Sequence, residues 1–254
     1  MTMIPTNTDV LGYRLKLGVI GPATNTVVQP DFDDLRPAGV TNHYSRIAVQ
    51  DVAGVNDETF IAATHEIGDN TLGAVHGVMP CHPDHLVMGM SAVTFYGGVV
   101  GGQRFQKMIE DASGVPATVG SVALVQALKA FPEVCRVAFL SPYFPSANAA
   151  VRVFLEESGF SVVRDISLQV TSWTGIAQVP EARLVETLKA LDGDDVDAIC
   201  QVGTNLSMIR LAAAAEKWLQ KPVIAINTAT YWAALRSCGV ADRKEGFGRL
   251  MAER

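Results

Sequence analysis

The sequence predicts an α/β protein made of two pseudo-symmetric, doubly wound halves, each with a parallel sheet, and an active-site cleft between them. Short apolar runs alternate with amphipathic stretches along the whole chain, which is the pattern of parallel strands covered by helices on both faces. Three pairs of segments also recur in the same order at similar spacing, which indicates a duplicated unit. A chain of 254 residues is long enough for two such halves.

Each predicted element follows from its periodicity and from the turn residues beside it. Apolar runs of strand length end in Pro, Gly, Ser or Asn, and the stretches between them repeat apolar residues every three to four positions. We expect strands at 16–21, 39–49, 85–90, 136–141, 160–168, 196–203 and 222–227, and helices at about 56–72, 98–113, 121–132, 146–158, 181–191, 208–220 and 229–238.

The internal repeat pairs strand ends of the two halves. "KLGVIGPATN" resembles "RVAFLSPYFPSAN", because both are strands that end in a proline turn, at Pro22 and Pro142. "HLVMGMSAVTF" resembles "AICQVGTNLSM" and pairs Gly89 with Gly203, and "VGSVALVQALKAF" resembles "INTATYWAALRSC". These offsets predict an N-terminal half at 1–115, joined by the tail 228–254, and a C-terminal half at 116–227.

Ligands of doubly wound proteins bind at the carboxyl ends of the strands, where the loops of the two halves face each other. The start of each following helix adds free N–H groups that favour anions. The predicted cleft is therefore lined by residues 22–26, 89–94, 141–144 and 203–205.

Composition and charge exclude several classes of protein. A net charge of −6 argues against a nucleic-acid partner, which a basic face would bind. No apolar run has the length of a membrane span, and the N-terminus lacks the pattern of a signal peptide, so we expect a cytoplasmic protein. The four cysteines are scattered without a CxxC pair, as reduced core thiols are. An assembly of identical chains is left open.

No metal or cofactor is predicted. "HGVMPCHPDH" (76–85) gathers three histidines, a cysteine and an aspartate, but its spacing matches no zinc pattern and it precedes a strand, away from the cleft. "GGVVGG" (97–102) matches neither a P-loop nor a dinucleotide fingerprint.

The loops "GVIGPATNT", "MGMSAVTFYGG", "SPYFPSAN" and "VGTNL", with the tail "GFGRLM", resemble the aspartate/glutamate racemase superfamily. The resemblance is to its branch of maleate cis-trans isomerases and arylmalonate decarboxylases, and it spans nearly the whole chain. It implies one or two cysteines that face each other across the cleft. Here the two cysteine positions are assigned to Gly89 and Gly203, so both thiols are replaced, and Cys200 lies in the preceding strand.

The resemblance also implies a cradle of backbone N–H groups and hydroxyls around a substrate carboxylate. Ser91, Tyr143 and Thr204 take the catalytic roles, because their hydroxyls would stabilise an enediolate. Each has a plainer alternative, as a helix cap or as a packed turn residue. The resemblance assigns the remaining substrate-binding positions to Pro22, Asn25, His43, Gly89, Met90, Gly203 and Asn205.

The expected function is that of a cofactor-independent lyase or isomerase acting on a small carboxylate through an enediolate-like intermediate. Decarboxylation is favoured, since it needs a thiol only to deliver a proton, which water or Tyr143 could supply instead. Two alternatives remain open: a hydrolase or dehydratase that uses the same anion cradle, and a non-catalytic carboxylate-binding protein.

Overall fold

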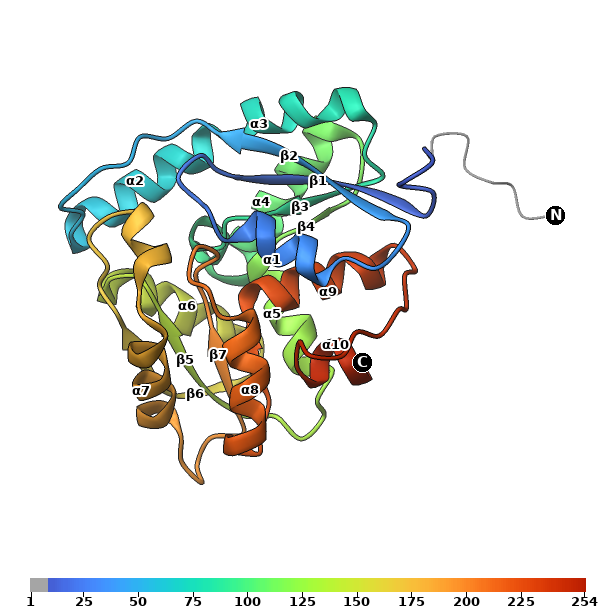
Figure 1. The fold of residues 1–254 in the computed structure, drawn as a ribbon. Coiled ribbons are helices and arrows are strands. Elements are labelled where there is room, and N and C mark those ends of the chain that lie inside the picture. The colour runs from blue at the N-terminus through green and yellow to red at the C-terminus, as the bar shows by residue number, and fades with distance from the viewer. Residues whose placement is uncertain (1–8) are drawn as a thin grey trace.

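The structure, a computed structural model, describes residues 9–254 and contains two parallel four-stranded sheets covered by helices, which confirms the predicted fold class (Figure 1). The strand orders are β2-β1-β3-β4 and β6-β5-β7-β8, so the two sheets share one topology. The first sheet consists of β1 (Leu15–Pro22), β2 (Val40–Ile47), β3 (His85–Met88) and β4 (Ala117–Thr118), and the second of β5 (Arg136–Ser141), β6 (Ser161–Ser167), β7 (Ala198–Gln201) and β8 (Val223–Ala225).

Helices connect the strands and cover both faces of each sheet. They are α1 (Val28–Leu35), α2 (Asp57–Asp69), α3 (Thr71–Val78), α4 (Gly98–Ser113), α5 (Gly120–Lys129), α6 (Pro145–Glu157), α7 (Glu181–Leu191), α8 (Ile209–Leu219), α9 (Ile226–Ser237) and α10 (Arg249–Glu253), with short 3₁₀ turns η1 (Met79–Cys81), η2 (Ala92–Phe95) and η3 (Thr174–Gln178).

The observed elements differ from the predicted ones mainly where a segment is short. The helix expected at about 56–72 is α2 followed by α3, because the chain breaks at Asn70, which ends one helix and begins the next. The helix α1 and the two-residue strand β4 were not predicted, since neither is long enough to show a period.

The two halves exchange helices near their boundary. The helix α9, drawn in red in Figure 1, follows the second sheet but contacts β3 and β4 of the first. It lies against α5, which follows the first sheet and contacts β8 of the second. The division at residue 115 stays a prediction: β4 follows it and still pairs with β3, and residues 1–8 lie outside the described part of the chain.

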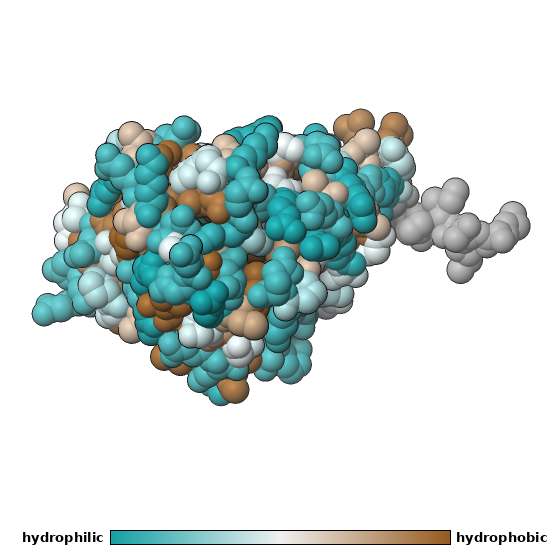
Figure 2. All heavy atoms as spheres, turned by 90° about the horizontal axis from the view of Figure 1, so that it is seen from below, coloured by the Kyte–Doolittle hydropathy of each residue, from teal (hydrophilic) through white to brown (hydrophobic). Residues whose placement is uncertain are grey.

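The core is continuous and the surface is polar. Apolar side chains of both sheets and of the helices around them form one buried cluster. On the face in Figure 2, hydrophilic residues cover most of the surface and apolar residues appear in small groups. Within residues 9–254, no helix is both long and apolar enough to cross a membrane.

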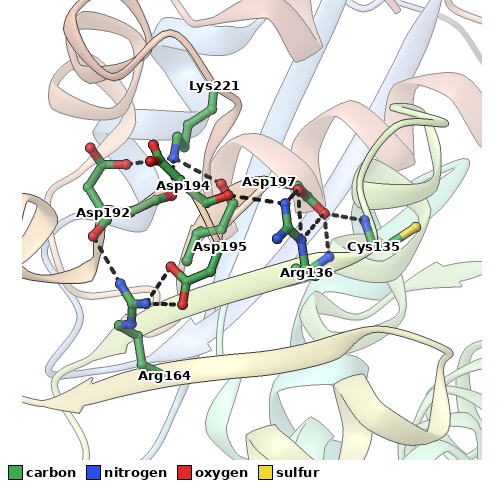
Figure 3. A network of polar contacts seen from close by, with 10 residues as sticks. Cys135, Arg136, Arg164, Asp192, Asp194, Asp195, Asp197 and Lys221 are labelled. Atoms are coloured by element: carbon green, nitrogen blue, oxygen red, sulfur yellow. Dashed lines mark hydrogen bonds and ion pairs between the residues drawn. The ribbon is translucent and has the colours of Figure 1, made fainter.

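An ion-pair network closes the amino-terminal edge of the second sheet (Figure 3). The turn between α7 and β7 carries four aspartates, and three of them meet cations from other segments. Arg136 of β5 pairs with Asp197, with 2.6 Å between Nη2 and Oδ1. Arg164 pairs with Asp195, and Lys221 with Asp192. This edge lies opposite the carboxyl ends of the strands, so the network lies away from the predicted cleft.

Candidate active site

A pocket lies at the carboxyl ends of both sheets, beside the points where the strand order reverses. Its cavity volume is about 40 Å³, so the pocket has room for only a small ligand. Among the described residues, the side chains that line it include no lysine, arginine or histidine, so backbone dipoles, hydroxyls and side-chain amides set its polarity. The pocket is lined by Pro22, Thr24, Asn25, Ile67, Met90, Ser91, Ala92, Tyr143, Trp173, Ile176, Gly203, Thr204 and Asn205.

Tyr143 and Ser91 meet across the boundary between the halves. The distance from Tyr143 Oη to Ser91 Oγ is 2.8 Å, and Ser91 Oγ also accepts a hydrogen bond from the N–H of Gly203 (3.2 Å). The hydroxyls of Tyr143 and Ser91 carry one hydrogen each. One of these hydrogens forms the bond between the two oxygens, so the other O–H can donate to a ligand. Burial raises the pKa of Tyr143 far above its usual value, so the phenol keeps its proton.

Tyr143 is held from behind by the segment that carries it. Its N–H donates to Ser141 Oγ (3.0 Å), and its carbonyl accepts from Ser167 Oγ (2.5 Å). The Phe60 ring packs on its ring, with 5.3 Å between centroids. Pro142 fixes the preceding backbone dihedral, and α6 begins two residues after Tyr143. The phenol therefore has one well-defined position.

Thr204, in the loop after β7, also contacts the first half of the protein. Its hydroxyl donates to the carbonyl of Gly89 (3.0 Å) and accepts from Asn25 Nδ2 (3.2 Å). Asn25 Oδ1 accepts from the N–H groups of Val27 and Val28 at the start of α1. Asn25 thus forms the Asx turn that begins α1 and also orients the Thr204 hydroxyl.

Asn205 stabilises the loop that follows β7 by hydrogen bonds to two other segments. Its side-chain oxygen accepts from the N–H of Thr26 (2.9 Å), and its amide donates to the carbonyl of Trp173 (2.8 Å). The same amide donates to the carbonyl of Thr24 (3.4 Å), so these bonds occupy the oxygen and both N–H groups of a side chain that lines the pocket.

Backbone N–H groups without an acceptor lie in the loop after β3 and in the loop after β7. Within residues 9–254, the N–H groups of Met90, Ser91, Thr204 and Asn205 make no hydrogen bond to another residue. Buried N–H groups are rarely left without an acceptor, and a cluster of them forms a site for an anion. The pocket can therefore bind a carboxylate without a cationic side chain.

The other wall of the pocket is apolar. Ile67 comes from α2, Ala92 from η2, Trp173 from the loop after β6, and Ile176 from η3. Ile67, Trp173 and Ile176 were not predicted. Trp173 follows the carboxyl end of a strand, a position that the rule for doubly wound sheets covers, whereas nothing in the sequence indicates Ile67.

The hydrogen-bond register corrects the pairing of Gly89 with Gly203. The N–H of Gly89 donates to Ile20 in β1, and the N–H of Val202 donates to Leu140, the equivalent residue of β5. Gly89 therefore corresponds to Val202, and Ser91 corresponds to Thr204. The structure brings Gly89 and Gly203 to the same pocket, but only Gly203 lines it, and Gly89 contributes its carbonyl.

Both glycines are closely packed against neighbouring groups. Gly203 has φ of +108°, and a Cβ there would lie 2.6 Å from Cγ of Pro142. A Cβ at Gly89 would lie 2.8 Å from a methyl of Val28. A side chain at either position would therefore require neighbouring groups to shift, and at Gly203 it would also strain the backbone.

The structure does not bring His43 to the pocket. It lies in the edge strand β2, where its Nε2 is 3.0 Å from Thr41 Oγ1, and it lines separate surface depressions. Its pairing with Gly18, early in β1, places it behind the carboxyl end of the sheet. His43 is therefore removed from the candidate site.

No cysteine lines the pocket within the described residues. Cys200 is fully buried in the middle of the second sheet, and burial raises its pKa to about 12. The other three are Cys81, Cys135 and Cys238, in η1, before β5 and at the end of α9.

Comparisons with known proteins agree with this fold. The arylmalonate decarboxylase of Bordetella bronchiseptica is 28% identical over 212 residues, which cover 78% of this chain and 88% of that protein. The maleate isomerase of Nocardia farcinica is 23% identical over 257 residues, covering 96% and 97%. A solved structure of a cysteine-to-serine mutant of the N. farcinica maleate cis-trans isomerase, with a covalently bound succinylcysteine intermediate, has a TM-score of 0.85 at 22% identity, covering 94% of this chain and 99% of that one.

Two like halves with a pocket between them define an enzyme of the aspartate/glutamate racemase superfamily, in the branch of maleate isomerases and arylmalonate decarboxylases. The family model described as arylmalonate decarboxylase matches residues 83–251, more than half of the chain. The chain belongs to the arylmalonate decarboxylase family, and it is a lyase or isomerase.

Proposed function

We propose that this protein is a cofactor-independent decarboxylase of a small malonate-type dicarboxylate. The observation that carries the proposal is the division of the pocket into a polar wall of hydroxyls and free N–H groups and an apolar wall, with no thiol among the described residues that line it. The polar wall suits a carboxylate that stays. The apolar wall suits one that leaves.

Binding comes first. One carboxylate accepts hydrogen bonds from the free N–H groups of Ser91 and Thr204 and from the O–H that the Tyr143–Ser91 pair has available. These donors are fixed by neighbouring bonds before the substrate arrives, so little reorganisation accompanies the reaction.

The second carboxylate then faces Ile67, Trp173 and Ile176, where its charge is poorly solvated. Its C–C bond to the central carbon breaks and CO2 leaves. The electron pair of that bond forms an enediolate with the retained carboxylate, and the added negative charge develops on the oxygens held by the polar wall. Poor solvation of the departing carboxylate favours its loss as a neutral molecule.

A proton must then be added to the central carbon. Burial favours the protonated phenol of Tyr143, which is therefore a poor proton source. We assign this step to a water molecule, which becomes hydroxide. Maleate isomerisation by addition of a thiolate to the double bond needs a nucleophilic sulfur, and no cysteine lines the pocket in the described residues.

Proton NMR of the purified chain with malonate, methylmalonate, phenylmalonate and maleate tests the proposal. We expect loss of CO2 from at least one malonate, with one deuterium at the central carbon in D2O, and no fumarate from maleate. Fumarate formation, or no turnover of any malonate, would overturn it. Inactivity of a Tyr143→Phe variant on the same substrate would link the activity to this pocket.

A further inference from the structure

A buried carboxyl lies close to the loop that follows β7 and carries Thr204, but it does not line the pocket. Asp31 of α1 is 7% exposed, and its Oδ2 accepts a hydrogen bond from Nδ2 of Asn227 (2.8 Å). The same Nδ2 donates to the carbonyl of Thr204 (2.9 Å). Asn227 lies in the first turn of α9 and is 2% exposed. One side-chain amide thus joins a buried acid to the backbone of a pocket residue.

These contacts close a ring around the start of α1. Asn25 begins that helix and holds the Thr204 hydroxyl, while Asp31, one turn along the same helix, reaches the Thr204 carbonyl through Asn227. Thr204 is therefore held at its hydroxyl by Asn25, just before α1, and at its carbonyl by Asn227 of α9, which is itself bonded to Asp31 of α1. The N–H groups of Thr204 and Asn205 make no hydrogen bond within the described residues, both residues line the pocket, and their positions depend on this loop.

Burying a carboxyl group costs free energy, which argues that Asp31 has a role. Burial raises the pKa of Asp31 to about 7, and the nearby Asp34 adds to the effect. Asn227 and the exposed Arg210 oppose it, and Tyr44 of β2 is the other ionisable group that faces it. Asn227 Oδ1 has no partner in the described residues, so the amide is oriented by Asp31 and Thr204 alone.

We propose that Asp31, acting through Asn227, is a positioning residue that holds the Thr204 loop in the geometry needed for carboxylate binding. The assignment rests on the proposed function, but its first readout does not require a substrate. Asp31 is not among the residues that line the pocket. Its effect is on the loop, and through the loop on affinity.

Amide hydrogen exchange tests the position of the loop directly. The N–H of Leu206 donates to the carbonyl of Gly203 within this loop and reports on its opening. Removing the acceptor in Asp31→Ala should speed exchange at Leu206 about tenfold, the equivalent of one lost hydrogen bond. Asp31→Asn keeps an acceptor oxygen for Asn227 and should exchange like the wild type. Asp34→Asn, an exposed acid on the same helix, is the matched control.

Kinetics then separate positioning from a merely structural role. With the malonate that the wild type turns over fastest, Asp31→Ala should raise KM about tenfold and change kcat by less, with Asp31→Asn restoring KM. Asn227→Ala cuts the same link from the other end and decides the matter if Asp31→Ala does not fold. Wild-type exchange at Leu206 in a folded Asp31→Ala or Asn227→Ala variant would overturn the proposal. Lack of turnover by the wild type would instead overturn the proposed function and leave the exchange experiment valid.

Discussion

The phenol oxygen of Tyr143 lies 2.8 Å from the hydroxyl oxygen of Ser91, although Tyr143 follows β5 of the second sheet and Ser91 follows β3 of the first. This contact joins the two halves at the pocket. Under the proposed function, this pair donates to negative charge that develops during the reaction, and the contact exists only when both halves are assembled.

Tyr143→Phe should fold and lose activity. The change removes one oxygen and leaves the ring packed on Phe60. Loss of a preorganised donor typically lowers kcat by about 10²–10³. Steady-state kinetics on the active malonate measure the effect, and thermal denaturation checks the fold. Tyr13→Phe, at an exposed tyrosine, is the control. Wild-type kcat in Tyr143→Phe would make Tyr143 a packing residue.

Single replacement of the four cysteines by alanine should leave turnover within about tenfold, because a thiol of raised pKa is a poor nucleophile. Burial raises the pKa of the thiols of Cys81, Cys200 and Cys238. The critical case is Cys200, whose replacement leaves a small cavity in the sheet. A folded Cys200→Ala protein without activity would show that the thiol positions were assigned wrongly.

Gly203→Ala should destabilise the protein by about 1–3 kcal/mol, since an alanine is strained at this φ and its Cβ meets Pro142. Urea denaturation measures the change. Gly73→Ala in α3 is the matched control, because its Cβ would meet nothing within 4 Å and alanine favours the helix. Equal stability of the two variants would contradict the role of Gly203.

Asp31 should make stability depend on pH. Its pKa is about 7 in the folded state and near 3.8 when unfolded, so the folded state binds the extra proton between these values. The free energy of unfolding should therefore fall as pH rises from about 4 to 7, by up to about 4 kcal/mol at 1.4 kcal/mol per pKa unit. Urea denaturation of Asp31→Asn should lack this fall and exceed the wild type at pH 8. An unchanged pH dependence in Asp31→Asn would refute the titration of Asp31.

Much of the fold could be predicted because its elements are long and periodic. The helix at 181–191 was placed at its observed bounds, and the strand ends at Pro22 and Ser141 located the cleft. The register was predicted less well. Sequence similarity alone made Gly89 equivalent to Gly203, whereas the hydrogen bonds between strands make it equivalent to Val202. Only these bonds fix the register of each sheet.

The sequence by itself determined the α/β class, the duplicated unit and the loops that carry Ser91, Tyr143 and Thr204, because periodicity and turn residues are local properties of the chain. Only the tertiary structure decided that Ile67 and Trp173 form the apolar wall, that His43 lies elsewhere, and that Asp31 reaches Thr204 through Asn227. The last link joins residues 196 positions apart in the sequence, and packing of α1 against α9 brings them together. Contacts of this kind follow from how elements pack, which no local pattern encodes.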